Sequence, residues 1–185
     1  MYASLFDLLS QSVTLKSEKT ASDAIQALNE GNLKAVIITD EGLTARANKK
    51  VLNKVKTFVQ NGGLAIVGLH FNPSPLGTHS TGSLLLLSSP GSGETIDVIP
   101  LTSIASVPCP PTAVAASFPE WVNMKAVHVA HVRPDERIFL SGSSYPEALE
   151  AGVAATQVGS GYLAYVGDAN AEVESNKVIL ALCGF

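Results

Sequence analysis

The fold is decided by residues 34–70, which read KAVIITDEGLTARANKKVLNKVKTFVQNGGLAIVGLH. The apolar run from Ala35 toward Asp40 predicts a strand that is covered on both faces. Apolar residues at helical spacing follow over residues 51–59, and Asn61-Gly62-Gly63 is a helix-ending sequence. Leu64 to Leu69 predicts a second buried strand. Because the links are short, we expect a parallel pair joined by a right-handed crossover helix.

Outward from this unit, the pattern predicts further helices and strands on both sides. Upstream, we expect a helix over residues 2–10, a short strand over Val13 to Lys16, and a second helix that ends at Gly31. Downstream, strands are expected at residues 124–132, 137–140, 154–158 and 162–166, and a helix begins near residue 175. Gly159-Ser160-Gly161 between the last two strands indicates a hairpin. The predicted fold is a three-layer α/β/α domain with a mostly parallel, flavodoxin-like sheet and a C-terminal β-hairpin.

Length and composition limit the function classes. A chain of 185 residues, 46% hydrophobic and 15% charged, is one domain, residues 1–185, and buries a large core. With net charge −4 and no cluster of basic residues, the sequence predicts no surface that binds the phosphates of a nucleic acid. The longest aliphatic run, Leu84 to Leu87, is far too short for a membrane helix. Two cysteines, expected to be free thiols, and no Asn-x-Ser/Thr site predict a cytoplasmic location.

Residues 74–117 differ from the rest of the chain. They are rich in Pro, Ser and Leu, and their only charged residues are Glu94 and Asp97. Such a stretch fits a mispredicted exon or a shifted reading frame, a hypothesis that peptide mapping of the native protein tests by showing the stretch intact. The glycine-rich fragments at residues 91–93 and 159–161 lack the full spacing of a phosphate loop, so we expect turns there and no cofactor.

Polar residues follow the predicted strands at the end where ligands bind in open α/β sheets. The first strand ends at Asp40, the second at His70 and Asn72, and the last at Asp168 and Asn170. The carboxylates and the histidine are candidate acids, bases or ligands, and the asparagines are candidates for orienting a substrate. Each has a structural alternative, since Asp and Asn cap turns and a strand-end histidine often packs in the core.

The remaining reactive side chains are weaker candidates. Cys109 lies among prolines without a basic neighbour, and Cys183 lies in an apolar helix, so we expect neither to be an activated nucleophile. His128 and His131 are three residues apart, which on a strand places them on opposite faces. We therefore predict no metal site.

Two stretches carry a resemblance to a known family. Residues 58–70, FVQNGGLAIVGLH, and residues 159–172, GSGYLAYVGDANAE, resemble the trehalose-utilisation-like branch of the class I glutamine amidotransferase-like superfamily, and chiefly its uncharacterised fungal members. The resemblance covers residues 1–73 and 121–185. The family's Gly-x-Cys-x-Gly elbow and its His-Pro-Glu are absent, so the resemblance implies no glutaminase chemistry by the usual Cys-His pair.

Two functions remain in this interpretation. The first is a non-catalytic or degenerate domain that binds a small polar metabolite in a cleft lined by Asp40, His70, Asn72, Asp168 and Asn170. The second is a hydrolase or isomerase acting on a sugar-like substrate, with His70 as general base and Asp168 as its partner. The missing cysteine favours the first.

The resemblance also implies a central opening strand that this chain lacks before its first helix. An unfilled gap leaves strand N–H and C=O groups unpaired. We therefore expect the gap to be filled by the flanking strands, by an apolar piece such as Ser83 to Ser88, or by a second chain, with a tendency to self-associate.

Overall fold

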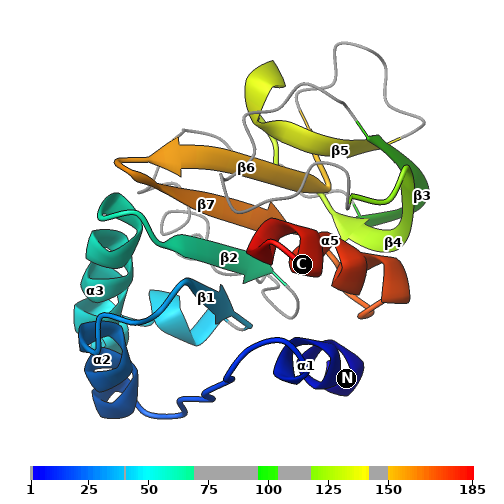
Figure 1. Ribbon diagram of the computed structural model, residues 1–185. Coiled ribbons are helices and arrows are strands. Elements are labelled where there is room, and N and C mark those ends of the chain that lie inside the picture. The colour runs from blue at the N-terminus through cyan, green and yellow to red at the C-terminus, as the bar shows by residue number, and fades with distance from the viewer. Residues whose placement is uncertain (1, 40, 69–95, 104–117, 142–149) are drawn as a thin grey trace.

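The computed structural model describes residues 2–39, 41–68, 96–103, 118–141 and 150–185, which form one sheet with helices packed against it (Figure 1). This confirms a mixed α/β fold. The helices are α1 (Ala3–Ser10), α2 (Ala21–Asn29), α3 (Lys49–Gln60) and α5 (Val173–Cys183), with short 3-10 turns η1 (Glu41–Thr44), η2 (Arg46–Asn48) and η4 (Pro134–Glu136). The strands are β1 (Ala35–Ile38), β2 (Leu64–Gly68), β3 (Ile96–Ser103), β4 (Trp121–Val127), β5 (Arg137–Ser141), β6 (Val153–Val158) and β7 (Gly161–Val166).

The unit that decides the fold forms as predicted. β1 and β2 pair in parallel, with Ala35 opposite Leu64 and Ile38 opposite Val67. The connecting helix α3 buries Val51, Val55 and Val59, which recur every four residues on one face. β2 is buried along its whole length, as its unbroken apolar sequence predicts.

The complete sheet has the order β1-β2-β7-β6-β5-β3-β4. β1, β2 and β7 are parallel neighbours, and the other four neighbouring pairs are antiparallel. The prediction of a mostly parallel sheet is therefore wrong from β7 to β4. Only Gly159 and Ser160 lie between β6 and β7, and so short a link turns the chain back on itself, because parallel neighbours need a crossover of about a dozen residues.

The strand β3 comes from the atypical segment 74–117, whose other residues all lie outside the described part of the chain. Its proline, Pro100, lies opposite Asn123 of β4, and pairing with β5 begins one residue later, at Leu101. Proline has no N–H to donate, so it is tolerated where one side of the strand does not require that bond. Ser83 to Ser88, expected as one filler of a gap, is outside the described residues.

Of three apolar clusters among the described residues, two join helices to the sheet. One joins Leu5 and Leu9 of α1, and Val178, Ile179 and Leu182 of α5, to strand residues that include Ile66, Phe139 and Val166. The other joins the buried face of α3 to Ala65, Val67 and Leu163, with Ala24, Ile25 and Leu28 of α2 packed against it. Figure 1 shows α2 and α3 together, apart from α1 and α5.

The predicted strand at Val13 to Lys16 is not formed. This segment lies between α1 and α2 and pairs with no described strand. Its residues are exposed except for Val13, which packs against the α1 cluster. A strand is stabilised by a ladder partner and a buried face, and this segment has neither along its length.

Candidate functional site

The three parallel strands bring their carboxyl ends to one edge of the sheet. β2 lies between β1 and β7, with Ile38, Val67 and Tyr165 in register near that edge. Neighbouring strands are about 4.8 Å apart, so the loops that follow these strands begin side by side. Of the five predicted site residues, Asp40, His70 and Asn72 are outside the described residues. Asp168 and Asn170, which follow β7, are described.

A glycine permits the close packing at this edge. Gly68, the last residue of β2, has φ +155°, and a β-carbon at this position would lie 2.0 Å from the carbonyl oxygen of Val166. No side chain fits there without moving the backbone of β7. The ends of β2 and β7 are therefore held together by main-chain contact.

Asp168 is fully buried, and its carboxylate is occupied by backbone donors. Oδ1 accepts hydrogen bonds from the N–H groups of Asn170 at 2.8 Å and Ala171 at 3.0 Å. Oδ2 accepts one from the N–H of Glu172 at 2.9 Å. The carboxylate thus orders the turn that leads from β7 into α5, in which Ala171 takes φ +61°. This is the structural alternative that the sequence left open for Asp168.

A second carboxyl group, that of Glu172, lies against the first. The N–H of Lys125 in β4 donates to its Oε1 at 3.3 Å, while its Oε2 is buried and has no hydrogen-bond partner among the described residues. Burial, followed by the hydrogen bond to Asp168 and that residue's negative charge, raises the pKa of Glu172 to about 6. When protonated, Glu172 donates to Asp168.

Tyr2 adds a neutral donor to this group. Its hydroxyl donates to the backbone oxygen of Asp168 at 3.4 Å, across 166 positions of sequence. Burial, with smaller contributions from the charges of Asp168 and Glu172, raises the pKa of Tyr2 to about 12. The phenol therefore stays protonated at neutral pH. Tyr2, Asp168 and Glu172 together tie α1, β7 and α5 at one point.

Sequence reasoning missed two members of this group. The spacing in Asp168-Ala169-Asn170-Ala171-Glu172 carried a signal for Glu172, because a buried Asp that caps a turn brings the residue four positions later close to its carboxylate. Tyr2 carried no such signal, since only the tertiary fold brings it to Asp168. Asn170 uses its backbone N–H in the turn and is exposed, so its side chain is accessible at the sheet edge.

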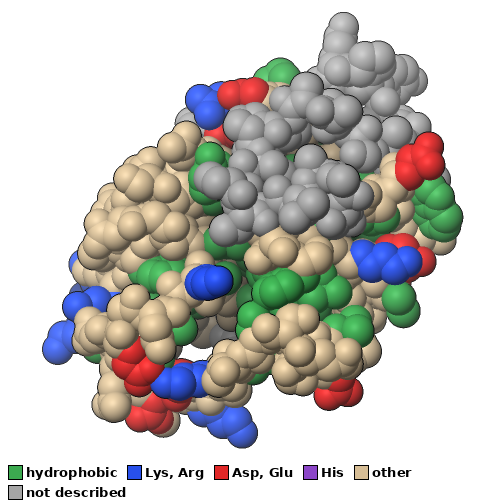
Figure 2. All heavy atoms as spheres, in the orientation of Figure 1, with side chains coloured by type: hydrophobic (Ala, Val, Ile, Leu, Met, Phe, Trp, Pro, Cys, Tyr) green, Lys and Arg blue, Asp and Glu red, His purple; other side chains and the backbone are tan. Residues whose placement is uncertain are grey.

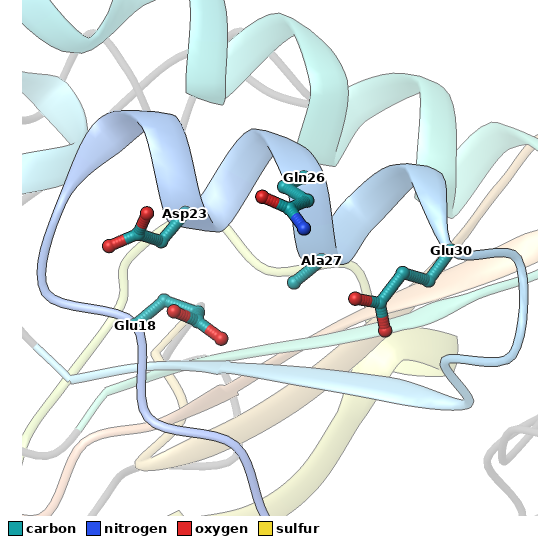
Figure 3. Close-up of a pocket in the computed structure, with 5 residues that line it drawn as sticks. All are labelled: Glu18, Asp23, Gln26, Ala27 and Glu30. Atoms are coloured by element: carbon teal, nitrogen blue, oxygen red, sulfur yellow. The ribbon is translucent and has the colours of Figure 1, made fainter.

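A separate pocket of about 180 Å³ lies on α2. It is lined by Glu18, Asp23, Gln26, Ala27 and Glu30, and Figure 3 shows Glu18 across from the side chains of α2. Glu30 also forms an ion pair with Lys16. In the part of the chain that the structure describes, no three His, Cys, Asp or Glu side chains form a group able to hold a metal ion.

The thiol of Cys183 is free and half-buried, and burial raises its pKa to about 11. It is therefore a weak nucleophile at neutral pH, as its place in the helix predicts. Cys109 lies outside the described residues. No helix among the described residues is long and apolar enough to cross a membrane.

Comparison with known proteins gives a likeness in fold. No protein-family model and no curated protein matches the chain. Among solved structures, a cytoplasmic protein from Salmonella typhimurium superposes with a TM-score of 0.57 at 11% identity, over 98% of this chain and 85% of that one. A β-galactosidase from Bacillus circulans sp. alkalophilus superposes with a TM-score of 0.49 at 15% identity, over 81% of this chain. This chain spans 22% of the length of that β-galactosidase.

Proposed function

We propose that the protein is a non-catalytic domain of the class I glutamine amidotransferase-like kind that binds a small polar metabolite at the carboxyl ends of β1, β2 and β7. The proposal includes the finer fold, a three-layer flavodoxin-like arrangement with a C-terminal hairpin. The observation that carries it is the state of the Asp168 carboxylate, which is buried and bonded to three backbone N–H groups.

This bonding argues against the enzyme alternative. A carboxylate has about four acceptor positions. In Asp168, backbone N–H groups take three, and the neighbouring carboxyl of Glu172 adds a fourth when it is protonated. A residue that orients a general base, or that exchanges protons with a substrate, needs an acceptor position facing that partner. The fourth position lies beside the carboxyl of Glu172 in a fully buried residue, so Asp168 has no exposed acceptor position to offer to His70.

Binding requires accessible polar groups but no proton transfer, and polar residues follow the strands at this edge of the sheet. Asn170 is exposed directly after the turn that Asp168 orders. Asp40, His70 and Asn72 follow the two neighbouring strands in the sequence, at the edge where α/β sheets bind ligands. Amide, carboxylate and imidazole groups suit the hydroxyls of a polar metabolite. The resemblance seen in residues 58–70 and 159–172, together with its missing cysteine, supports the same function.

A thermal-shift screen of sugars, nucleotides and divalent metal ions tests the proposal. A ligand at about 100 times its Kd stabilises the fold by about 2.7 kcal/mol, which raises Tm by roughly 5–10 °C for a domain of this size. We expect His70→Ala and Asn170→Ala to reduce that rise while leaving the unliganded Tm within about 2 °C of wild type. Asn53→Ala, which changes an exposed asparagine on α3, is the matched control and should keep the full response.

The same ligands distinguish the alternative function. Incubation of each stabilising ligand with the protein, followed by NMR, should show the ligand unchanged. Conversion that disappears in His70→Ala would overturn the non-catalytic proposal in favour of a hydrolase or isomerase. A cytoplasmic location, predicted from the two cysteines, belongs to the same proposal, and the description of the Salmonella protein as cytoplasmic is in keeping with it.

A further inference from the structure

The outer edge of β1 is the feature that the proposed function does not use. β1 is the first strand of the sheet order and pairs with β2 alone among the described strands. All four of its residues are half-buried. Proteins commonly protect such an edge with a charged residue, a proline or a bulge. The sequence Ala35-Val36-Ile37-Ile38 contains no charged residue and no proline.

The ladder geometry identifies the groups that point outward. The N–H of Leu64 donates to the carbonyl of Lys34, so Lys34 faces β2. Successive residues of a strand turn their backbone groups to opposite sides, so Val36 and Ile38 also face β2, while Ala35 and Ile37 face away from it. In the described part of the chain, the N–H and C=O groups of Ala35 and Ile37 have no backbone partner. Among the described residues, they are therefore available for two pairs of main-chain hydrogen bonds.

The two sides of this edge differ in chemistry. On one side, the half-buried side chains of Val13, Ala35 and Ile37 pack with the apolar cluster of α1. On the other side, Ile38 shares an apolar cluster with α2, the helix that carries the acidic pocket of Glu18, Asp23 and Glu30. Lys16 is the one cation that pairs with these carboxylates among the described residues. An extended segment on this edge would turn alternate side chains toward an apolar and an acidic surface.

The chain between α1 and α2 limits the size of the occupant. It runs from Val13, in the cluster of α1, to Lys16 and Glu18, beside α2, and the ion pair of Lys16 with Glu30 fastens it there. Figure 2 shows the surface hollowed in this area, between α2 and α1. A second copy aligned along β1 needs room for its own β2 and helices beside this connection, whereas an extended peptide needs only the width of one strand, about 4.8 Å.

We propose that the outer edge of β1 binds an extended peptide segment of a partner protein, about five to seven residues long, in which apolar and basic side chains alternate. The peptide adds a strand to the sheet through the outward groups of Ala35 and Ile37. Its apolar side chains face Val13 and the cluster of α1, and its basic side chains face the carboxylates of the α2 pocket.

The probe is the peptide acetyl-Val-Lys-Val-Lys-Val-Lys-Val-amide, titrated into the full chain at low salt and followed by fluorescence anisotropy. We expect saturable binding and slowed hydrogen exchange at the amides of Ala35 and Ile37. A peptide with Glu in place of Lys should bind at least about fivefold more weakly, and the Lys peptide should lose affinity as salt screens the carboxylates. A version with prolines at alternate positions should not bind.

Two variants, each with a matched control, make the test specific. Ala35→Pro removes an outward N–H and spares the bonds to β2, so Kd should rise about three- to tenfold with circular dichroism unchanged. Ala35→Val keeps the N–H and should bind as wild type. Glu18→Lys should weaken the Lys peptide and strengthen the Glu peptide, whereas Glu120→Lys, an equal charge change at another exposed site, should do neither.

Several results would overturn the proposal. They are an absence of saturable binding, equal affinity for the Lys and Glu peptides, and protection from exchange that avoids β1. A dimer by light scattering that Ala35→Pro abolishes would assign the edge to a second copy instead, in agreement with the self-association expected from the sequence.

Discussion

Substitution of Glu172 by glutamine tests the carboxyl pair directly. A glutamine amide keeps an oxygen for the N–H of Lys125 and offers an N–H to Asp168, so it imitates the protonated glutamic acid at every pH. Because the pKa of Glu172 is raised from 4.5 to about 6 in the folded state, the fold holds its proton more tightly than the unfolded chain does. The stabilisation is complete below about pH 4.5 and is lost as pH rises through about 6.

The size of the expected difference in free energy of unfolding follows from the pKa shift of Glu172. A difference of about 1.5 pKa units corresponds to roughly 2 kcal/mol, and solvent screening of a partly open carboxyl reduces this to about 1 kcal/mol. We expect wild type and Glu172→Gln to have nearly equal free energies of unfolding at about pH 3.5, below the unfolded-state pKa of 4.5. Near pH 7.5, the variant should be more stable by about 1 kcal/mol.

Urea unfolding followed by circular dichroism, at intervals between these pH values, measures the difference between the two proteins. Titrating groups that do not contact Glu172 are the same in both proteins, so their contributions cancel in that difference. Glu174→Gln, in the first turn of α5, makes the same chemical change two residues away and is the control for the substitution itself. A wild type that gains stability on the variant as pH rises would refute the reasoning, because it would mean that the fold favours the ionised Glu172.

Three further predictions concern the fold around this point. Asp168→Ala leaves three backbone N–H groups without their acceptor and should lower the free energy of unfolding by about 3 kcal/mol, measured in urea at pH 7. Gly68→Ala sets a β-carbon against the carbonyl oxygen of Val166 and should cost at least about 2 kcal/mol in the same assay, and a loss under about 0.5 kcal/mol would show that the strands can separate freely. Cys183 should be alkylated much more slowly in the folded protein than in urea, as read by mass spectrometry of its peptide, and equal rates would contradict its burial and raised pKa.

The parts of the fold that follow local patterns were predictable from the sequence. The stripe of valines in α3 and the unbroken apolar runs of β1 and β2 report burial directly, because each depends on side-chain spacing within a few residues. The strand β3 was not predicted as a strand, since the low charge and the prolines of its surroundings gave no periodic signal. The order of the strands in the sheet was also not predicted. Whether two strands pair in parallel or antiparallel depends on the length of the connection between them, which side-chain spacing within a strand does not report.

The role of Asp168 in the candidate site could not be predicted from the sequence for a different reason. An aspartate after a buried strand carries the same sequence pattern whether its carboxylate faces a ligand or the backbone of the next turn. Here Asp168 does the second, and three N–H groups within four residues account for its burial. The local cost of burying this carboxylate is offset by these bonds, and burial beside it raises the pKa of the neighbouring carboxyl of Glu172 to about 6. The residue predicted as a catalytic partner therefore positions Asn170 at the surface, and a search for the ligand should start from that exposed amide and the strand ends beside it.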